Sequence, residues 1–147
     1  MRPGALVVLL SALVACCFAG TAEEAMTFYR TGMQLLEANQ PFDALTAFSK
    51  AIAKNPKFAD GYYGQGEAYS RTSRYPLAIK AYTEALALAP IHAGALAGRA
   101  FAHYFAEEYD LSASDFAAAV KADTSRADTI INFLFKEMAT YRSSLKK

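Results

Sequence analysis

The side chains that could bind a metal ion or transfer a proton are few in this chain. Both cysteines lie near the start, at Cys16 and Cys17, and the two histidines are His92 and His103. His103 and Glu107 are four residues apart, which on a helix would place both side chains on one face. One such pair leaves a zinc ion short of its usual four ligands. We therefore predict no metal site, no cofactor and no catalytic residue, with His103 packed inward and His92 solvated in a turn.

The charge pattern argues against nucleic acid as a partner. The 147-residue chain has 15 lysines and arginines against 14 aspartates and glutamates, and the two signs are interspersed. A protein that neutralises a run of phosphates needs clustered positive side chains, and the sequence shows no such cluster. No glycine-rich phosphate motif follows a strand pattern either. We therefore expect neither a nucleic-acid partner nor an enzymatic function.

Residues 1–22 have the layout of a signal peptide. A positive charge at Arg2 is followed by an apolar run over 5–15 and then by small residues. The tetrapeptide 13–16 resembles the lipobox of bacterial lipoproteins, which would make Cys16 the lipid-attachment residue and anchor the protein to a membrane. The alternatives are a signal peptide cleaved after Ala19 or Ala22, and an uncleaved anchor. We expect an exported protein, either periplasmic or membrane-anchored as a lipoprotein.

The rest of the chain contains a repeat. Residues 25–58, 59–92 and 93–126 align without a gap at a period of 34 residues. Three positions of the repeat hold small residues: Gly32, Gly66 and Ala100; Ala44, Ala78 and Ser112; Ala51, Ala85 and Ala119. Three other positions hold mainly large residues: Phe28, Tyr62 and Leu96; Leu35, Tyr69 and His103; Phe48, Tyr82 and Phe116.

Each repeat predicts a pair of helices. Apolar residues recur at helical spacings within each half, and the segments 39–41, 72–74 and 107–108 interrupt them. Prolines at Pro56 and Pro90 separate one pair from the next, because proline cannot donate an amide hydrogen bond. After the third repeat, an apolar stripe over 126–145 predicts a further helix that covers the end of the stack.

This pattern resembles the tetratricopeptide repeat over about 100 of the 147 residues. The resemblance implies an all-α fold: an α-solenoid of three helical hairpins and a C-terminal capping helix, in one domain over 23–147. It also implies a concave groove lined by the first helix of each hairpin. The groove residues would be Tyr29, Met33, Leu36, Tyr63, Glu67, Phe101 and Tyr104, with Gly64, Gly94 and Gly98 as its floor.

One departure from the family bears on the partner. Chaperone-binding members of the family hold a C-terminal carboxylate with a set of lysine, asparagine and arginine side chains. The corresponding positions here hold no cation, being Tyr29, Met33, Gly64, Gly94 and Gly98. The resemblance therefore disfavours a chaperone tail as partner, and Asp60 and Glu67 would select against acidic ligands.

Two hypotheses about function remain. The first is a non-enzymatic scaffold or adaptor that binds a peptide or protein segment in the aromatic, apolar groove. The second is a structural homo-oligomer that self-associates through the last helix or the third repeat. The first hypothesis requires that the aromatic residues be exposed, whereas aromatic stripes at helical spacing also occur in buried cores.

Overall fold

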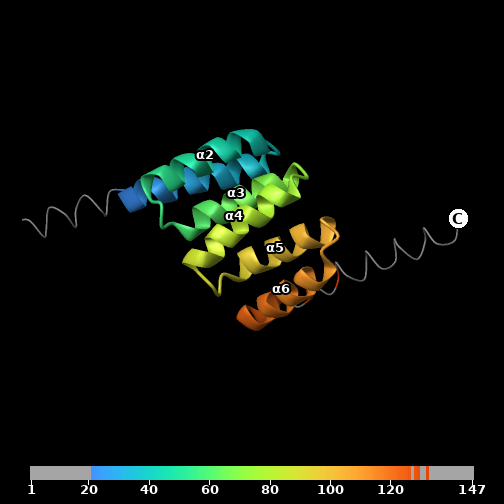
Figure 1. Cartoon of the computed structure of the whole chain (residues 1–147). Coiled ribbons are helices and arrows are strands. Elements are labelled where there is room, and N and C mark those ends of the chain that lie inside the picture. Colours follow the sequence, from blue (N-terminus) through green and yellow to red (C-terminus); the bar gives the residue numbers. More distant parts are fainter. Residues whose placement is uncertain (1–20, 127, 130–131, 133–147) are drawn as a thin grey trace, which may run out of the picture.

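The computed structural model describes residues 21–126, 128–129 and 132, and these residues form helices joined by turns, without a strand among them. Residues 21–37 are helical, and five α-helices and a short 3-10 helix follow: α2 (Pro41–Lys54), α3 (Ala59–Arg71), α4 (Tyr75–Leu88), α5 (Ala93–Phe105), α6 (Tyr109–Ala122) and η1 (Thr124–Arg126). Figure 1 shows the helices stacked in chain order. Within the described residues, no helix is long and apolar enough to span a bilayer.

The helices form three successive hairpins, which confirms the predicted all-α repeat architecture. The first members are the helix over 21–37, α3 and α5, and the second members are α2, α4 and α6. Besides the pairing within hairpins, α3 packs directly on α5. The leader with Cys16 lies outside the described residues. So does most of the expected helix over 126–145, of which residues 128, 129 and 132 are described and helical.

The turn inside each hairpin has the same backbone conformation. Asn39, Ser73 and Glu107 have φ angles of 58°, 56° and 64°, in the left-handed region. In the first turn the amide of Gln40 donates to the carbonyl of Leu35, and the amide of Asn39 donates to that of Leu36. This bonding satisfies the free carbonyls at a helix C-terminus and is known as a Schellman motif. The 34-residue period is therefore present in the backbone as well as in the side chains.

Two buried rings fix the distance between hairpins. A Cβ atom added to Gly32 would lie 2.5 Å from the Phe48 ring, and one added to Gly64 would lie 2.4 Å from it. Phe48 is fully buried, so its ring fills the space between glycines of the first helix and of α3. Tyr82 repeats the arrangement one hairpin later, between glycines of α3 and α5. The hairpins can therefore stack this closely only because these glycines have no side chains.

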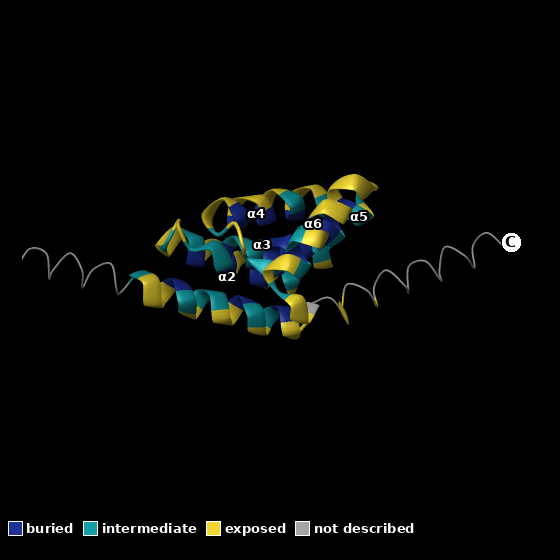
Figure 2. Cartoon of the chain, turned by 90° about the horizontal axis from the view of Figure 1, so that it is seen from below, coloured by how far each residue is buried: buried dark blue, intermediate teal, exposed yellow. Residues whose placement is uncertain are grey.

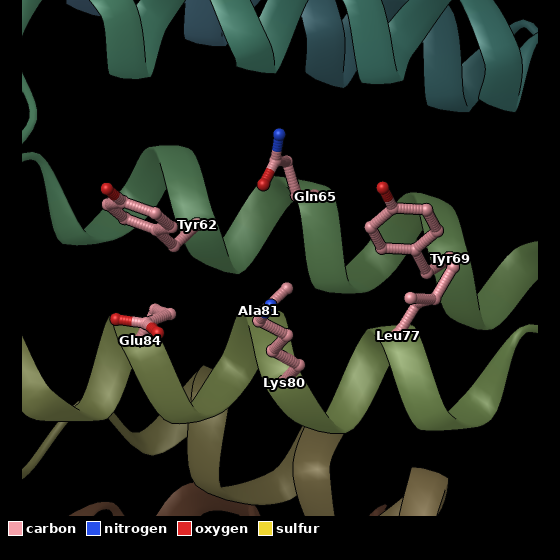
Figure 3. Close-up of a pocket in the computed structure, with 7 residues that line it drawn as sticks. All are labelled: Tyr62, Gln65, Tyr69, Leu77, Lys80, Ala81 and Glu84. Atoms are coloured by element: carbon pink, nitrogen blue, oxygen red, sulfur yellow. The ribbon is translucent and has the colours of Figure 1, made fainter.

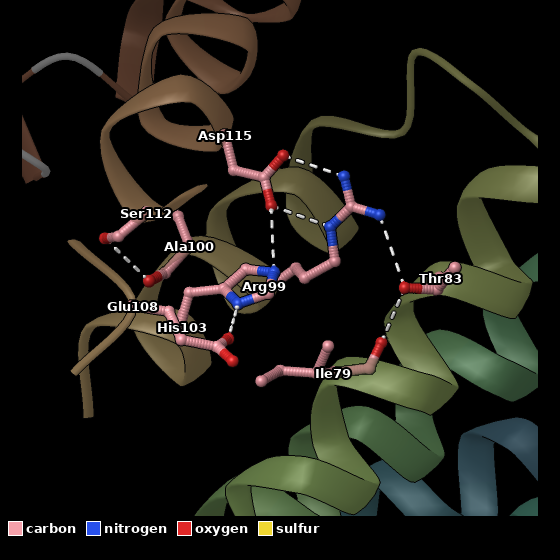
Figure 4. A network of polar contacts seen from close by, with 8 residues as sticks. All are labelled: Ile79, Thr83, Arg99, Ala100, His103, Glu108, Ser112 and Asp115. Atoms are coloured by element: carbon pink, nitrogen blue, oxygen red, sulfur yellow. Dashed lines mark hydrogen bonds and ion pairs between the residues drawn. The ribbon is translucent and has the colours of Figure 1, made fainter. Parts of the chain in front are cut away.

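The third hairpin is held to the second by a polar network (Figure 4). Arg99 donates from Nε and Nη2 to the two carboxylate oxygens of Asp115, both at 2.7 Å, and from Nη1 to Thr83 of α4 at 3.3 Å. His103 Nδ1 lies 2.5 Å from Glu108, and its Nε2 lies 3.8 Å from Asp115. The bidentate pair of Arg99 and Asp115 joins α5 to α6, and the hydrogen bond from Arg99 to Thr83 joins α5 to α4.

Candidate functional site

The first helices of the hairpins carry a partly exposed aromatic surface. The six residues that form it are neither fully buried nor fully exposed. Because the first helix of each hairpin can be called its A helix, we call these six residues the A-helix surface: Tyr29, Met33, Tyr63, Glu67, Phe101 and Tyr104. In Figure 2, the buried parts of the helices face their neighbours and the exposed parts face outward. The prediction that Leu36 lines the same surface is wrong, since only 1% of it is exposed and it packs in the core with Ala44 and Phe48.

The three glycines predicted to form an open groove floor are buried instead. A Cβ on Gly64 would meet the ring of Phe48, and a Cβ on Gly98 would lie 2.5 Å from Tyr82. At Gly94 the same atom would lie 3.1 Å from His92 and 3.2 Å from Tyr63. The missing side chains are thus replaced by aromatic rings of neighbouring elements, and the predicted trough is filled.

Three aromatic residues of the A-helix surface, Tyr29, Tyr63 and Phe101, each pack against a buried ring. Tyr29 lies 5.8 Å from Phe48 and 5.7 Å from Phe58, measured between ring centroids. Tyr63 lies 6.0 Å from Tyr82. The same support holds Phe101 edge-on against Phe116, at 5.0 Å. A ring that packs against another ring keeps a more fixed orientation, which lowers the entropy cost of a contact that it makes.

A fixed carboxylate lies among these rings. The hydroxyl of Tyr82 donates to Glu67 Oε1 at 2.7 Å and lies 3.3 Å from the hydroxyl of Ser70. Burial raises the pKa of Tyr82, and the Glu67 charge raises it further. Burial also raises the pKa of Tyr29, with smaller contributions from Asp60 and Glu67. Tyr29, Asp60 and Glu67 therefore form one electrostatic group across the first helix and α3.

His92, predicted to be solvated, is instead a structural part of this surface. Its Nδ1 accepts a hydrogen bond from the amide of Ala95 at 3.0 Å, which caps the N-terminus of α5. Since Nδ1 accepts, the proton is on Nε2, which donates to Asp60 Oδ1 at 2.9 Å. The ring also lies 4.9 Å from that of Tyr63. A histidine directly before a helical pattern was the available signal for this role.

Tyr104 belongs to a second aromatic group, at the hairpin turns. Its ring lies 5.5 Å from Phe105 and 5.7 Å from Tyr109, and Phe105 stacks on Tyr75 at 5.0 Å. Phe105 and Tyr109 are exposed by 46% and 59%. The A-helix surface therefore continues at the Tyr104 end into an exposed aromatic patch of α5 and α6.

A hollow of about 420 Å³ lies between α3 and α4 and was not predicted (Figure 3). Its lining comes from both helices and is of mixed polarity: Tyr62, Gln65, Tyr69, Leu77, Lys80, Ala81 and Glu84. In the third hairpin the positions that correspond to Gln65 and Ala81 hold Arg99 and Asp115, whose ion pair joins the two helices. The hollow shares no residue with the A-helix surface.

The histidine considered as a metal ligand has another role. His103 is buried and pairs with Glu108, and not with Glu107 as its helical spacing had suggested. In the part of the chain that the structure describes, no group of three or more histidine, cysteine, aspartate or glutamate side chains is arranged so that it could hold a metal ion.

Comparison with known proteins identifies the repeat. The tetratricopeptide repeat model matches residues 29–93 and 63–128, and no curated protein sequence matches the chain. The first TPR domain of human RPAP3 is 15% identical, with a TM-score of 0.73 over 84% of this chain and 98% of that one. The second TPR of Spaghetti (RPAP3), bound to the HSP90 peptide SRMEEVD, is 20% identical, with a TM-score of 0.67 over 69% and 94%. MamA is 25% identical, with a TM-score of 0.62 over 74% and 58%. The chain thus belongs to the tetratricopeptide repeat family, whose fold is an interaction scaffold and not a catalytic one.

Proposed function

We propose that this protein is a non-enzymatic scaffold that holds a peptide or protein segment against the A-helix surface. The observation that carries the proposal is the row of half-exposed rings at Tyr29, Tyr63 and Phe101, each supported from below by another ring. Aromatic side chains bury a large area with few rotatable bonds, which is why they are enriched where proteins bind. The Spaghetti domain of the same fold was solved with a bound peptide, which supports this mode of use.

The signal-like leader supports a location outside the cytoplasm. The layout of residues 1–22 favours export, and Cys16 offers a point of lipid attachment. We propose that the scaffold acts as a periplasmic or membrane-tethered adaptor. Mass spectrometry of the N-terminus of the native protein distinguishes a lipidated Cys16 from cleavage after Ala19 or Ala22, and an intact Met1 in the mature protein would contradict cleavage altogether.

A peptide-display selection tests the scaffold function. Random peptides selected on the full chain should lose binding to a Tyr63→Ala/Phe101→Ala variant by about tenfold or more, because two central aromatic contacts are removed. The matched control is Tyr62→Ala/Tyr69→Ala, which removes two rings of α3 that line the separate hollow. Circular dichroism must show that both variants remain helical. Peptides that bind the first variant as well as the parent chain would show that the A-helix surface is not the binding site.

Self-association through the third hairpin is the second candidate function. It is favoured by Tyr109 and Leu111 of α6, which are 59% and 53% exposed. Light scattering at increasing protein concentration separates the two functions, since a mass that stays at 15.9 kDa before processing, or slightly lower after it, contradicts self-association.

A further inference from the structure

We propose that the segment bound by the A-helix surface carries two positively charged side chains, which pair with Asp60 and Glu67 of α3. This inference rests on the proposed function and names the chemistry of its partner. The two acids are seven residues apart on one helix, so their attachment points are separated by roughly 10 Å along the helix axis.

Both carboxylates are held in place and both keep an oxygen available. Asp60 Oδ1 accepts from His92, and Glu67 Oε1 accepts from Tyr82. Among the described residues, no hydrogen bond is made by Asp60 Oδ2 or Glu67 Oε2. An ionised carboxylate can accept several hydrogen bonds, so each acid has capacity for a cationic donor. Because the acids are already oriented, a partner loses less conformational entropy on binding them.

The arginines of the described first helices do not pair with these two acids. The helix over 21–37, α3 and α5 each contain one arginine, and each arginine is directed elsewhere. Arg30 lines a separate hollow with Ala22 and Met26, and Arg71 donates to the carbonyl of Leu36 at 2.7 Å. Arg99 is engaged with Asp115. Among the described residues, no lysine or arginine is shown to pair with Asp60 or Glu67, so these two acids complement a cationic segment.

The rings beside the acids suit the stems of long cationic side chains. Tyr63 lies between Asp60 and Glu67 in α3, and Tyr29 of the neighbouring helix is close enough to both for their charges to raise its pKa. Lysine and arginine bury their methylene stems on apolar surfaces and attract aromatic faces through their charge. Acids flanked by rings thus favour lysine or arginine over a simple cation.

The spacing of the acids predicts a sequence pattern in the partner. In a peptide with the polyproline II conformation, which has three residues per turn and a rise of about 3.1 Å, side chains three positions apart lie on one face about 9 Å apart, so the two cations would be separated by two residues. In a helical partner the same distance corresponds to seven residues. An acidic tail such as the SRMEEVD peptide of the Spaghetti complex has the opposite charge and would be repelled.

Three fluorescein-labelled peptides of ten residues test the inference on the full chain. They share two phenylalanines and differ only at two positions separated by two residues, which hold arginine, glutamine or glutamate. By fluorescence anisotropy, the arginine peptide should bind roughly three- to tenfold more tightly than the glutamine peptide, and the glutamate peptide most weakly. Raising the salt concentration should reduce the difference, because screening weakens exposed ion pairs.

Isosteric variants assign the effect to the two acids. Asp60→Asn/Glu67→Gln keeps acceptors for His92 and Tyr82 but removes both charges, so the arginine and glutamine peptides should bind this variant equally. Glu84→Gln removes one charge from α4, next to the separate hollow, and should leave the preference intact. Circular dichroism shows whether each variant is folded.

The outcomes separate this inference from the proposed function. If the parent chain binds the arginine and glutamine peptides equally, and Tyr63→Ala/Phe101→Ala weakens both, the inference is wrong and the scaffold function stands. If binding does not respond to that aromatic variant, or none of the three peptides binds, both are contradicted. A preference that survives Asp60→Asn/Glu67→Gln would place the cation site elsewhere and overturn the inference.

Discussion

Tyr82 combines packing and electrostatics in one side chain. Its ring is fully buried between glycines of α3 and α5, and its hydroxyl donates to Glu67. Folding therefore favours the neutral phenol, and the pKa is raised above the usual value of 10.0. A group with a raised folded-state pKa contributes stability below its unfolded pKa and loses that contribution as the pH rises toward the folded value. The pH window in which Tyr82 destabilises the fold thus begins at about pH 10.

We expect Tyr82→Phe to lower the free energy of unfolding by about 2 kcal/mol at pH 7, because a hydrogen bond to a charged acceptor is lost. Above pH 10 the variant should lose stability less steeply than the parent chain, since one phenol no longer titrates. Urea unfolding between pH 7 and pH 11 measures both effects. Tyr109→Phe, at a position that is 59% exposed, is the control and should change neither. Equal slopes for Tyr82→Phe and the parent would contradict this account.

Single residues were predicted unevenly by the sequence. Tyr29, Tyr63 and Phe101 are each partly exposed, as the binding hypothesis requires, but their assignment to a binding surface stays a prediction. Leu36 was misassigned because a position near the end of the first helix can point into the core formed with α2 as easily as into solvent. The role of His92 depends on Asp60, 32 residues earlier, and a single sequence does not show such a contact.

At the scale of elements, the turns store conformational strain. Left-handed φ angles cost an L-residue free energy because Cβ approaches the following carbonyl, and asparagine tolerates them better than serine or glutamate. The three hairpin turns hold Asn39, Ser73 and Glu107 in this conformation. The second and third turns therefore hold residues that are less suited to it.

We expect Glu107→Gly to raise the free energy of unfolding by about 0.5–1 kcal/mol, since glycine relieves the strain but gains freedom in the unfolded chain. Thermal unfolding followed by circular dichroism measures it. The same replacement at Lys80, an exposed position inside α4, should cost about 1 kcal/mol, because glycine is a poor helix former. If both replacements destabilise the protein, the turn at Glu107 is not strained.

The helices could be predicted from the sequence because two signals coincide at each hairpin. A helical period of apolar residues ends where turn residues begin, and the same pattern returns after 34 residues, at Ala59 and again at Ala93. The polar link between Arg99 and Asp115 was missed because it crosses from one helix to another over 16 residues. The sequence does contain a signal for this link, because two positions of the repeat are both charged in the third copy and uncharged in the other two.

At the scale of the whole molecule, that link joins the two helices of the third hairpin and holds Arg99 where it also donates to Thr83 of the second hairpin. Asp115 is 8% exposed and is the only acid shown to pair with Arg99 among the described residues. We expect Asp115→Asn to lower the free energy of unfolding by about 2–4 kcal/mol, since it leaves a half-buried guanidinium without its counter-charge. Hydrogen exchange should show α5 and α6 losing protection before the first hairpin.

Gln65→Ala is the matched control for that prediction. Gln65 occupies the equivalent position of the second hairpin and donates to Ser49 at 3.1 Å, an exposed neutral contact. Its loss should cost less than about 1 kcal/mol. Equal effects of the two substitutions would show that the ion pair contributes no more than a surface hydrogen bond.

The rings of Phe48 and Tyr82 have a consequence for how this protein could be lengthened. Each ring packs partly against its own hairpin and partly against the next one, where Phe48 contacts Gly64 and Tyr82 contacts Gly98. The unit over 59–92 therefore contains a glycine that accommodates the ring of the preceding hairpin. It also contains a ring that packs into the following hairpin. If a duplicate of that unit is spliced in after His92, Gly64 of the copy meets the ring of Tyr82 in place of Phe48, and Tyr82 of the copy meets Gly98 as before. A four-hairpin chain should therefore fold and extend the row of tyrosines and acids by one step.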